Sequence, residues 1–466
     1  IRNSDFDANN WGNNRVGQPK TPLHYNQFGT TLSGPVKIPK LYDGHNRTFF
    51  FFNYEGYRYA QPSSGLYSLP TPAMHTGDFS QLEQANCQQI VLYDPQTTVP
   101  NPNRPGYYLR APFPGNIIPQ SRFDPVSENV EKYYPMPNIA PSNACANTNN
   151  YYGSETEHRT TNQYMYRLDH RFSDKNTLFF HHFIYGQWRD NGGSNLYPSP
   201  LVRDRYDPVL DHNLALSDVH IFSPSVANEF RLGLNRGNYY FTVASNGQDM
   251  PEKLGLPASV PEDSFPGISN GLPGFQTGTI GHRATEIWQL YDAVSVNHGR
   301  HSLKVGIDFW LTQANAIQET APSGSFTFSS ALTGNPDPSY TGPSGYGFAT
   351  FLLGQVSSAS ATTHLGTAQV GKSYSFFVQD NMKLSKRLVL NVGLRYSLQQ
   401  PPFERNNGSS RFSLDKNPLT NLPGETQYMG VDFDRVYQTN KTDFAPRLGF
   451  AYDLFGDQKT VLRGGY

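Results

Sequence analysis

The sequence predicts an all-β chain folded as an antiparallel up-and-down barrel, and three observations lead to that fold class. Alternating apolar and polar residues recur along its 466 residues in paired runs joined by short turns. These short turns alternate strictly with long connections. Charged residues make up only 16% of the chain and aromatic residues 14%, while 41 glycines and 36 prolines suit turns and loops better than helices. The net charge of −1 gives no sign of nucleic-acid binding.

About six hairpins, or twelve strands, follow one another in the chain. The first hairpin pairs NQFGTTLSGPV with RTFFFFNYEGYRY, and the second turns at residues 173–176. The third hairpin turns at residues 223–226, the fourth at 297–300, the fifth near 385–386 and the sixth near 456–457. The expected strands cover residues 26–36, 47–59, 164–172, 177–188, 214–222, 227–241, 286–296, 301–311, 373–384, 387–398, 446–455 and 459–466.

Within a strand, side chains alternate between two faces, and several of these runs divide cleanly. In residues 388–396 the apolar side chains of Leu390, Val392 and Leu394 oppose Asn391, Gly393 and Arg395. The return arm 177–188 is aromatic on both faces, so its parity stays ambiguous. The polar side chains expected on a wet inner surface are Arg167, Asp169, Arg171, Glu229, Arg231, Lys304, Asp308, Asn391 and Arg395. Such residues can contact a solute, but ladders of ion pairs that fix the wall or seat a plug are the more common arrangement.

The loop asymmetry indicates a membrane. One connection spans residues 60–161, and the later ones are about 20 to 55 residues long. Outer-membrane barrels have short periplasmic turns and long extracellular loops, and their tilted strands need roughly 9 to 11 residues to cross. Only a closed barrel satisfies every backbone group in hydrocarbon, so we expect the apolar face to meet lipid and the charged face to line a lumen. A large soluble sandwich or propeller is the alternative.

Aromatic residues near the expected strand ends support the membrane interpretation, because such residues form girdles at bilayer interfaces. They are Tyr57, Tyr59, Tyr185, Trp188, Tyr239, Tyr240, Trp288, Trp310 and Tyr396.

No motif indicates an enzyme, a metal site or a cofactor. Residues Gly366 to Ser373 fit the phosphate-loop pattern, but an alternating strand follows where a helix is required. His181 and His182 are adjacent, so on a strand they point to opposite faces. Cys87 and Cys145 both lie in the longest connection, where a disulfide is favoured over two free thiols.

Several stretches together resemble the TonB-dependent outer-membrane receptors of the Oar-like group, whose N-terminal part carries a carboxypeptidase-regulatory-like domain. They run in the family's order from NQFGTTLSGPV with RTFFFFNYEGYR, through LYDPQTT, PFPGNIIPQSRFDPVSENVEKYYPMPN, FSPSVANEFRLGLNR and GFATFLLGQ, to SYSFFVQDNMKLSKRLVLNVGLRYSLQQPP and DFAPRLGFAYDLFGDQKTVLRGGY. The resemblance implies a barrel of about 22 strands in the outer membrane of a Gram-negative bacterium, with a plug in its lumen.

Such a receptor imports a scarce small or oligomeric solute, namely siderophore-iron, cobalamin, an oligosaccharide or a peptide, with energy from the TonB complex. Residues 1–466 contain no stretch that resembles the family's plug or its TonB-contacting segment, and Tyr466 falls within an expected strand. We therefore expect residues 1–466 to be a partial barrel domain, the central part of a longer protein. The alternative function is a structural or adhesion protein of the outer membrane that acts through its long surface loops.

Overall fold

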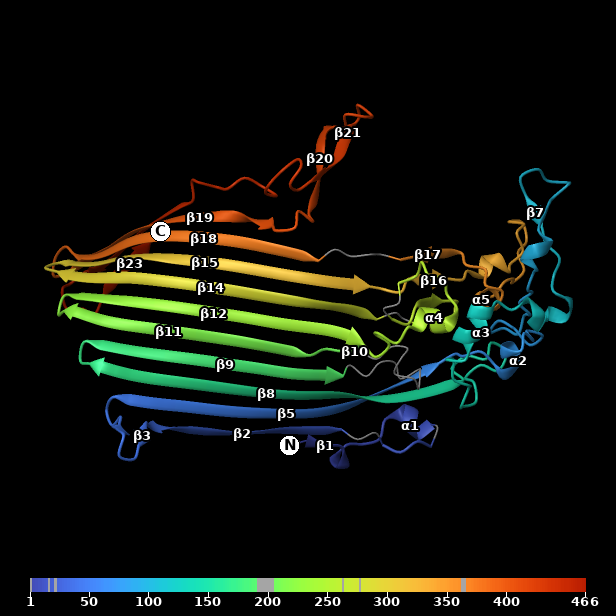
Figure 1. Ribbon diagram of the computed structural model, residues 1–466, viewed down its shortest axis with the longest axis horizontal. Helices are drawn as coiled ribbons and strands as arrows, with labels where there is room; N and C mark the ends of the chain where they lie inside the picture. Colours follow the sequence, from blue (N-terminus) through green and yellow to red (C-terminus); the bar gives the residue numbers. More distant parts are fainter. Residues whose placement is uncertain are drawn as a thin grey trace.

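The computed structural model describes residues 2–15, 17–20, 23–190, 205–261, 264–275, 278–361 and 366–466. They form one long antiparallel sheet with a compact body at one end (Figure 1). Each strand pairs with its neighbours in the chain, as the hairpin pattern predicts. The long strands are β2 (His24–Pro35), β5 (Thr48–Tyr67), β8 (Tyr151–Ser173), β9 (Asn176–Asp190), β11 (Val209–Ser223), β12 (Val226–Val243), β14 (Thr279–His298), β15 (His301–Thr320), β18 (Thr367–Lys383), β19 (Leu388–Glu404), β22 (Phe444–Asp453) and β23 (Val461–Gly465).

All twelve expected strands are present, and the all-β antiparallel fold class is confirmed. Two short strands extend the sheet. Strand β1 (Arg2–Asn3) pairs with β2, and β10 (Arg205–Tyr206) lies beside β12 just before β11 begins. Smaller two- and three-stranded sheets decorate the connections: β3 (Lys37–Ile38) with β4 (Tyr42–Asp43), β6 (Val99–Pro100) with β7 (Tyr108–Leu109), β20 (Ser410–Lys416) with β21 (Pro423–Tyr428), and β13 (Gly267–Ser269) with β16 (Ser325–Thr327) and β17 (Ser358–Ser360).

Several strands, among them β14, β15, β18 and β19, extend beyond the expected ranges at the end away from the short turns, and in β5 and β8 this corrects the boundaries of the longest connection. Strand β5 continues to Tyr67 and β8 begins at Tyr151, with Gln61 opposite Glu157 and Tyr67 opposite Tyr151. The connection is therefore residues 68–150 and not 60–161. Both faces of this added ladder are polar or mixed, so no alternation marks it in the sequence. The aromatic residues Tyr57, Trp288 and Trp310, expected near strand ends, consequently lie in the middle of 20-residue strands.

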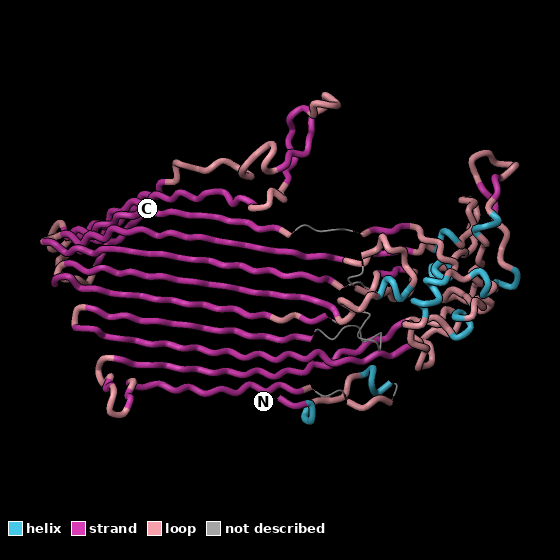
Figure 2. The backbone as a smooth tube through the Cα atoms, in the orientation of Figure 1, coloured by secondary structure: helices cyan, strands magenta, loops and turns pink. Residues whose placement is uncertain are grey.

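The compact body at the end opposite the short turns is built from three connections that are far apart in the chain (Figure 2). We call residues 68–150, 244–261, 264–275 and 321–361 the cap. Its helices are short: α2 (Pro72–His75), η2 (Pro95–Thr97), η3 (Pro114–Asn116), η4 (Gln120–Arg122), α3 (Pro125–Glu131), α4 (Met250–Leu254), η6 (Ser330–Leu332) and α5 (Gly347–Leu352). Two further helices, η1 (Ser4–Phe6) and α1 (Trp11–Arg15), lie near the N-terminus.

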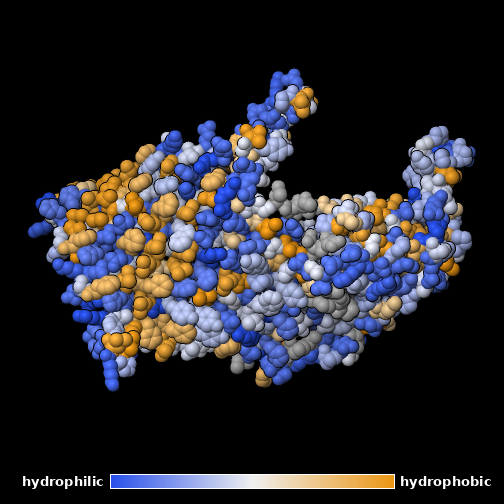
Figure 3. Space-filling view, viewed as in Figure 1, coloured by the Kyte–Doolittle hydropathy of each residue, from blue (hydrophilic) through white to orange (hydrophobic). Residues whose placement is uncertain are grey.

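The hydrophobic core lies in the cap and not under the sheet. Phe79, Phe265 and Phe348, one from each connection, are fully buried in a single cluster that also holds Leu92 and Ile118. The strands instead carry exposed apolar side chains, such as Phe376 at 52% and Leu394 at 43% exposure. Figure 3 shows hydrophobic residues gathered over the strands on the face in view. No helix among the described residues is long and apolar enough to span a membrane.

Candidate functional site

The sheet has one apolar face and one polar face, and the strand register defines both. A single cross-strand row on the apolar face joins Phe50, Leu168, Phe180, Leu216, Leu232, Leu290, Phe309, Tyr374 and Leu398. The row one residue away, on the polar face, joins Phe51, Arg167, His181, Ala215, Gly233, Gln289, Trp310, Ser373 and Gln399. The register thus settles the parity of residues 177–188, which the sequence left ambiguous.

The polar residues expected on an inner surface all lie on the polar face, because each shares the parity of the second row. Most of the charged ones pair with one another. Arg395 contacts Asp308 at 3.2 Å, and Gln289 donates to the same carboxylate at 3.0 Å. Lys304 lies 3.4 Å from Glu229, which also pairs with Arg231.

The remaining members of that set are also paired within one strand or across a turn. Arg167 binds Asp169 at 2.7 Å, and Arg171 binds Asp174 in the turn at 2.7 Å. Asn391 donates to Asn381 at 2.5 Å. These contacts form a ladder of ion pairs and hydrogen bonds along and between the strands of the polar face. The sequence placed these groups on one face, but the choice of partners depends on register.

A second group of ion pairs on the polar face was missed from the sequence, because its residues fall near or within the supposed long loops. Glu157 accepts from Arg189 at 2.8 Å and from Arg159 at 3.2 Å. Arg205 binds the buried Asp207 at 2.7 Å. The only sequence signal was the density of opposite charges. These pairs line the sheet near the cap.

The aromatic residues expected at bilayer interfaces divide between the two faces. Trp188, Tyr240, Trp288 and Tyr396 lie on the apolar face, where lipid contact is possible. Tyr57, Tyr59, Tyr185, Tyr239 and Trp310 share the polar face. The interpretation of this second set as an interfacial girdle was therefore wrong, because position along a strand does not fix the face.

The adjacent histidines lie on opposite faces of the sheet, and the two cysteines are joined to each other. His182 lies on the apolar face with its Nε2 3.1 Å from Nδ1 of His212, whereas His181 lies on the polar face. Among the described residues, only Glu83, Cys87 and Cys145 bring three ligand-type atoms together. The two sulfurs are joined in a disulfide, with Cα atoms 5.0 Å apart, and so are not available as thiolate ligands.

The phosphate-loop pattern does not form a phosphate site. Its residues after Gly366 belong to strand β18, where Lys372 pairs across to Leu311 and Ser373 to Trp310. The backbone amides are therefore used in the sheet and do not surround an anion. No helix follows whose N-terminus would meet a phosphate.

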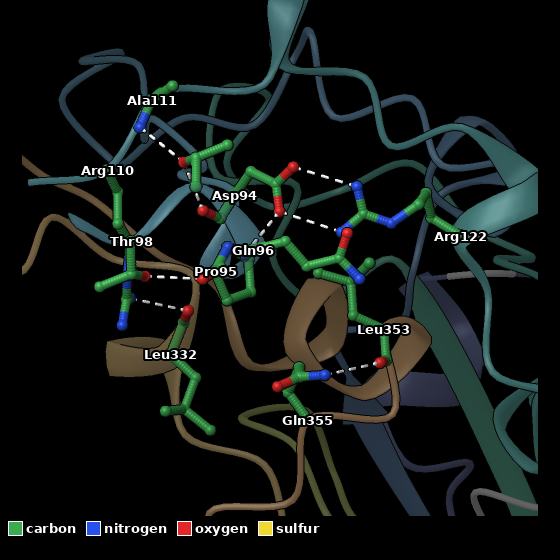
Figure 4. Close-up of polar contacts among 11 residues, drawn as sticks. Asp94, Pro95, Gln96, Thr98, Arg110, Ala111, Arg122, Leu332, Leu353 and Gln355 are labelled. Atoms are coloured by element: carbon green, nitrogen blue, oxygen red, sulfur yellow. Dashed lines mark hydrogen bonds and ion pairs between the residues drawn. The ribbon is translucent and has the colours of Figure 1, made fainter.

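Polar contacts connect the segments of the cap (Figure 4). Asp94 and Arg122 form two hydrogen bonds of 3.0 Å in a fork, and the hydrogen bonds from Arg122 hold the pKa of the Asp94 carboxyl below its usual value. Arg110 reaches from segment 68–150 to the carbonyl oxygens of Leu332 at 2.8 Å and of Ala331 and Gly334 at 3.2 Å. Burial lowers the pKa of this guanidinium.

Other buried groups complete the cap. Asn116 donates to the carbonyl oxygens of Phe79 and Ile90 and accepts from the amide of Leu92, so one side chain holds three chain segments together. Ser127 of α3 donates to the carbonyl oxygen of Phe351 in α5. Burial raises the pKa of the Tyr346 phenol to about 12. The cap is therefore one packed body with a shared core and not a set of independent loops.

The comparison with protein families agrees with a barrel. A family model described as an outer membrane beta barrel domain matches residues 1–466. No curated protein sequence matches the chain significantly. Three solved structures that resemble it are the outer membrane transporter YddB from Escherichia coli (10% identity, 99% of this chain and 42% of that one, TM-score 0.44), the copper transporter OprC (9%, 95% and 43%, TM-score 0.42), and a mutant of the ferric enterobactin receptor PfeA from Pseudomonas aeruginosa (10%, 95% and 41%, TM-score 0.37). The chain spans less than half the length of each.

Proposed function

The chain belongs to the outer membrane β-barrel domain family, and from that premise we propose that it is part of a receptor that imports a scarce solute across the outer membrane. Members of this family are barrels of the Gram-negative outer membrane, and they are not enzymes. In this proposal the apolar face contacts lipid, the polar face lines the lumen, and the cap receives the solute at the cell surface. The solute class is siderophore-iron, cobalamin, an oligosaccharide or a peptide.

One observation supports the proposal above the others: a folded cap stands at the mouth of a wall that is polar on one side. A membrane anchor needs only the apolar face. In this proposal the polar face of the 14-stranded sheet lines a water-filled path, and the cap, which is folded at the end of the sheet opposite the short turns, covers the outer end of that path. We further propose that the TonB complex supplies the energy, acting through a plug domain, and that the Oar-like receptors are the subgroup concerned.

Growth under limitation tests this function. A deletion strain and its complemented derivative would be grown in competition with each other in four media. The limiting nutrient would be ferric siderophore, cobalamin, an oligosaccharide mixture or a peptide mixture. We expect a defect with one nutrient class, and an equal defect when the TonB gene is deleted. A protein that acts by adhesion would instead change surface attachment without requiring TonB, and would leave growth in all four media unchanged.

Two matched variants connect the test to the cap. Phe348→Ala removes a fully buried ring that contacts Phe79, Tyr134 and Phe351. Such a truncation costs about 3 to 5 kcal/mol in a packed core, so uptake should fall. Leu422→Ala, at an exposed position of the β20–β21 hairpin, is the control and should complement fully.

A further inference from the structure

The polar face contains a cavity of about 280 Å³ that its ion pairs do not fill. Strands β14, β15, β18, β19 and β22 each contribute to it. It lies away from the cap, in the half of the wall nearer the short turns. Its lining includes Tyr291, Lys304, Phe377, Gly393, Arg395 and Arg447. We call it the Gly393 cavity.

The cavity exists because Gly393 has no side chain. Gly393 lies between Gln379 and Arg447 in the register, in the middle of paired sheet. A Cβ added there would lie 3.4 Å from the carbonyl oxygen of Val378 and 3.6 Å from Cβ of Gln379, which are ordinary contact distances. The backbone therefore does not require glycine at this position, and the consequence of glycine is open space on the polar face.

The charges around the cavity do not balance. Lys304 and Arg231 share the carboxylate of Glu229, and Arg395 contacts Asp308. Arg447 makes no side-chain hydrogen bond or ion pair with any residue that the structure describes. Three cations, Lys304, Arg395 and Arg447, thus line the cavity, and its lining includes no carboxylate. Because like charges at close range repel, an anion placed among them would be strongly favoured over a neutral solute.

The walls of the cavity are aromatic. The rings of Tyr291 and Phe377 stack with centroids 6.0 Å apart, and Nζ of Lys304 lies 5.8 Å from the centroid of Tyr291. These rings supply apolar surface beside the cations. The site therefore suits a compact molecule with a short carbon frame and several anionic oxygens.

We propose that the Gly393 cavity binds a small polyanion through its carboxylate or phosphate oxygens, as a station on the route of the solute along the lumen. The forked guanidinium groups of Arg395 and Arg447 each offer parallel N–H donors to a planar oxyanion, and Lys304 adds a compact positive charge. The cavity volume admits a molecule of the size of citrate. The assignment as a station on the route rests on the proposed import function, whereas the binding itself does not.

Calorimetric titration of the purified full-length receptor in detergent tests the site, with citrate and inorganic phosphate as the probes. Gly393→Leu fills the cavity and should abolish binding. Arg447→Gln removes one cation without leaving a partner unpaired, and should weaken binding about tenfold. Gly371→Leu is the matched control, since Gly371 lies on the same face and a Cβ added to it would meet nothing within 4 Å, and its affinity should equal that of the wild type. Heat-dependent gel migration would show that each variant is folded.

The proposal is overturned if the wild type binds neither probe up to about 10 mM, a range that would reveal millimolar affinity. It is also overturned if Gly393→Leu and Arg447→Gln bind citrate and phosphate as the wild type does. Failure of the import function would be seen separately, as normal growth of the deletion strain in all four limiting media while the calorimetric signal and its dependence on Gly393 remain.

Discussion

The apolar face should reject a cation at Leu394 and tolerate one at Asn391. Leu394 lies opposite Val378 and Pro446 and is 43% exposed, so an arginine there would place its guanidinium against hydrocarbon. The cost of a cation near the bilayer midplane is about 2 to 4 kcal/mol. Asn391 lies on the polar face beside Asn381, where an arginine stays hydrated and should cost less than about 1 kcal/mol.

The neighbouring position Val392 provides an internal check on this reasoning. It shares the apolar face with Leu394, but its cross-strand neighbour is Asp380. An arginine at Val392 would form a cross-strand ion pair, which contributes roughly 0.2 to 1 kcal/mol. We therefore expect Val392→Arg to be less costly than Leu394→Arg by about that amount, and more costly than Asn391→Arg.

The assay is reversible urea unfolding of the full-length protein in bilayers, which gives the change in free energy of unfolding for each variant. A soluble sandwich with Leu394 in its core would also disfavour arginine, so stability alone does not identify lipid. A nitroxide attached at Leu390, Val392 or Leu394 resolves this. Collision with oxygen should exceed collision with a water-soluble nickel reagent at all three sites. Sites inaccessible to both reagents, or equal costs at Leu394 and Asn391, would refute the assignment of the two faces.

Three further predictions concern the cap and the orientation of the sheet. Replacing Cys87 and Cys145 by serine should destabilise the cap by about 4 kcal/mol, because the cross-link closes a loop of 58 residues; non-reduced digests should contain the linked peptide pair, and alkylatable thiols would contradict it. Arg122 holds the pKa of Asp94 below its usual value, so the carboxylate stabilises the cap at pH values above the ordinary pKa of about 4, and this stabilisation is lost as the pH falls through the lowered pKa. Asp94→Asn should therefore make the melting temperature of the cap less sensitive to acid. An unchanged dependence of the melting temperature on pH would argue against this role. An epitope at Gln84 should be labelled on intact cells and one at Lys386 should not, and the reverse pattern would invert the orientation.

The strands were predictable from the sequence because their signal is local. In β19, each side chain from Leu390 to Arg395 reports its own face through the period of two, and the register confirms that division. The same period excluded the phosphate loop at Gly366, since the strand it predicted is present. This alternation of side chains does not show which residue of the neighbouring strand lies opposite each position. The contacts of Glu229 with Lys304, and of Asp308 with Arg395, join residues 75 and 87 positions apart.

The cap was not predictable for the same reason. Phe79, Phe265 and Phe348 lie in segments with neither helical nor strand periodicity, and each is buried only because the other two segments are present. Helix α5, Gly347–Leu352, is buried along its whole length and so shows no polar face by which to recognise it. The candidate Gly393 cavity depends on five strands meeting in one register, which the sequence of any single strand does not reveal.

The length of β14 and β15 has a consequence for what meets this protein first. Each strand has 20 residues, whereas a tilted crossing takes roughly 9 to 11. With the short turns at the periplasmic surface, as we propose, the surplus of about ten residues, at about 3.3 Å per residue and a tilt near 40°, extends the wall about 25 Å beyond the hydrocarbon layer, a distance that includes the headgroups. In the proposed orientation, that height would hold the cap outside the lipid bilayer, at the cell surface. Antibodies and phages would therefore encounter the cap, and selection for escape from them would fall on its surface, while the band of strands below is shielded.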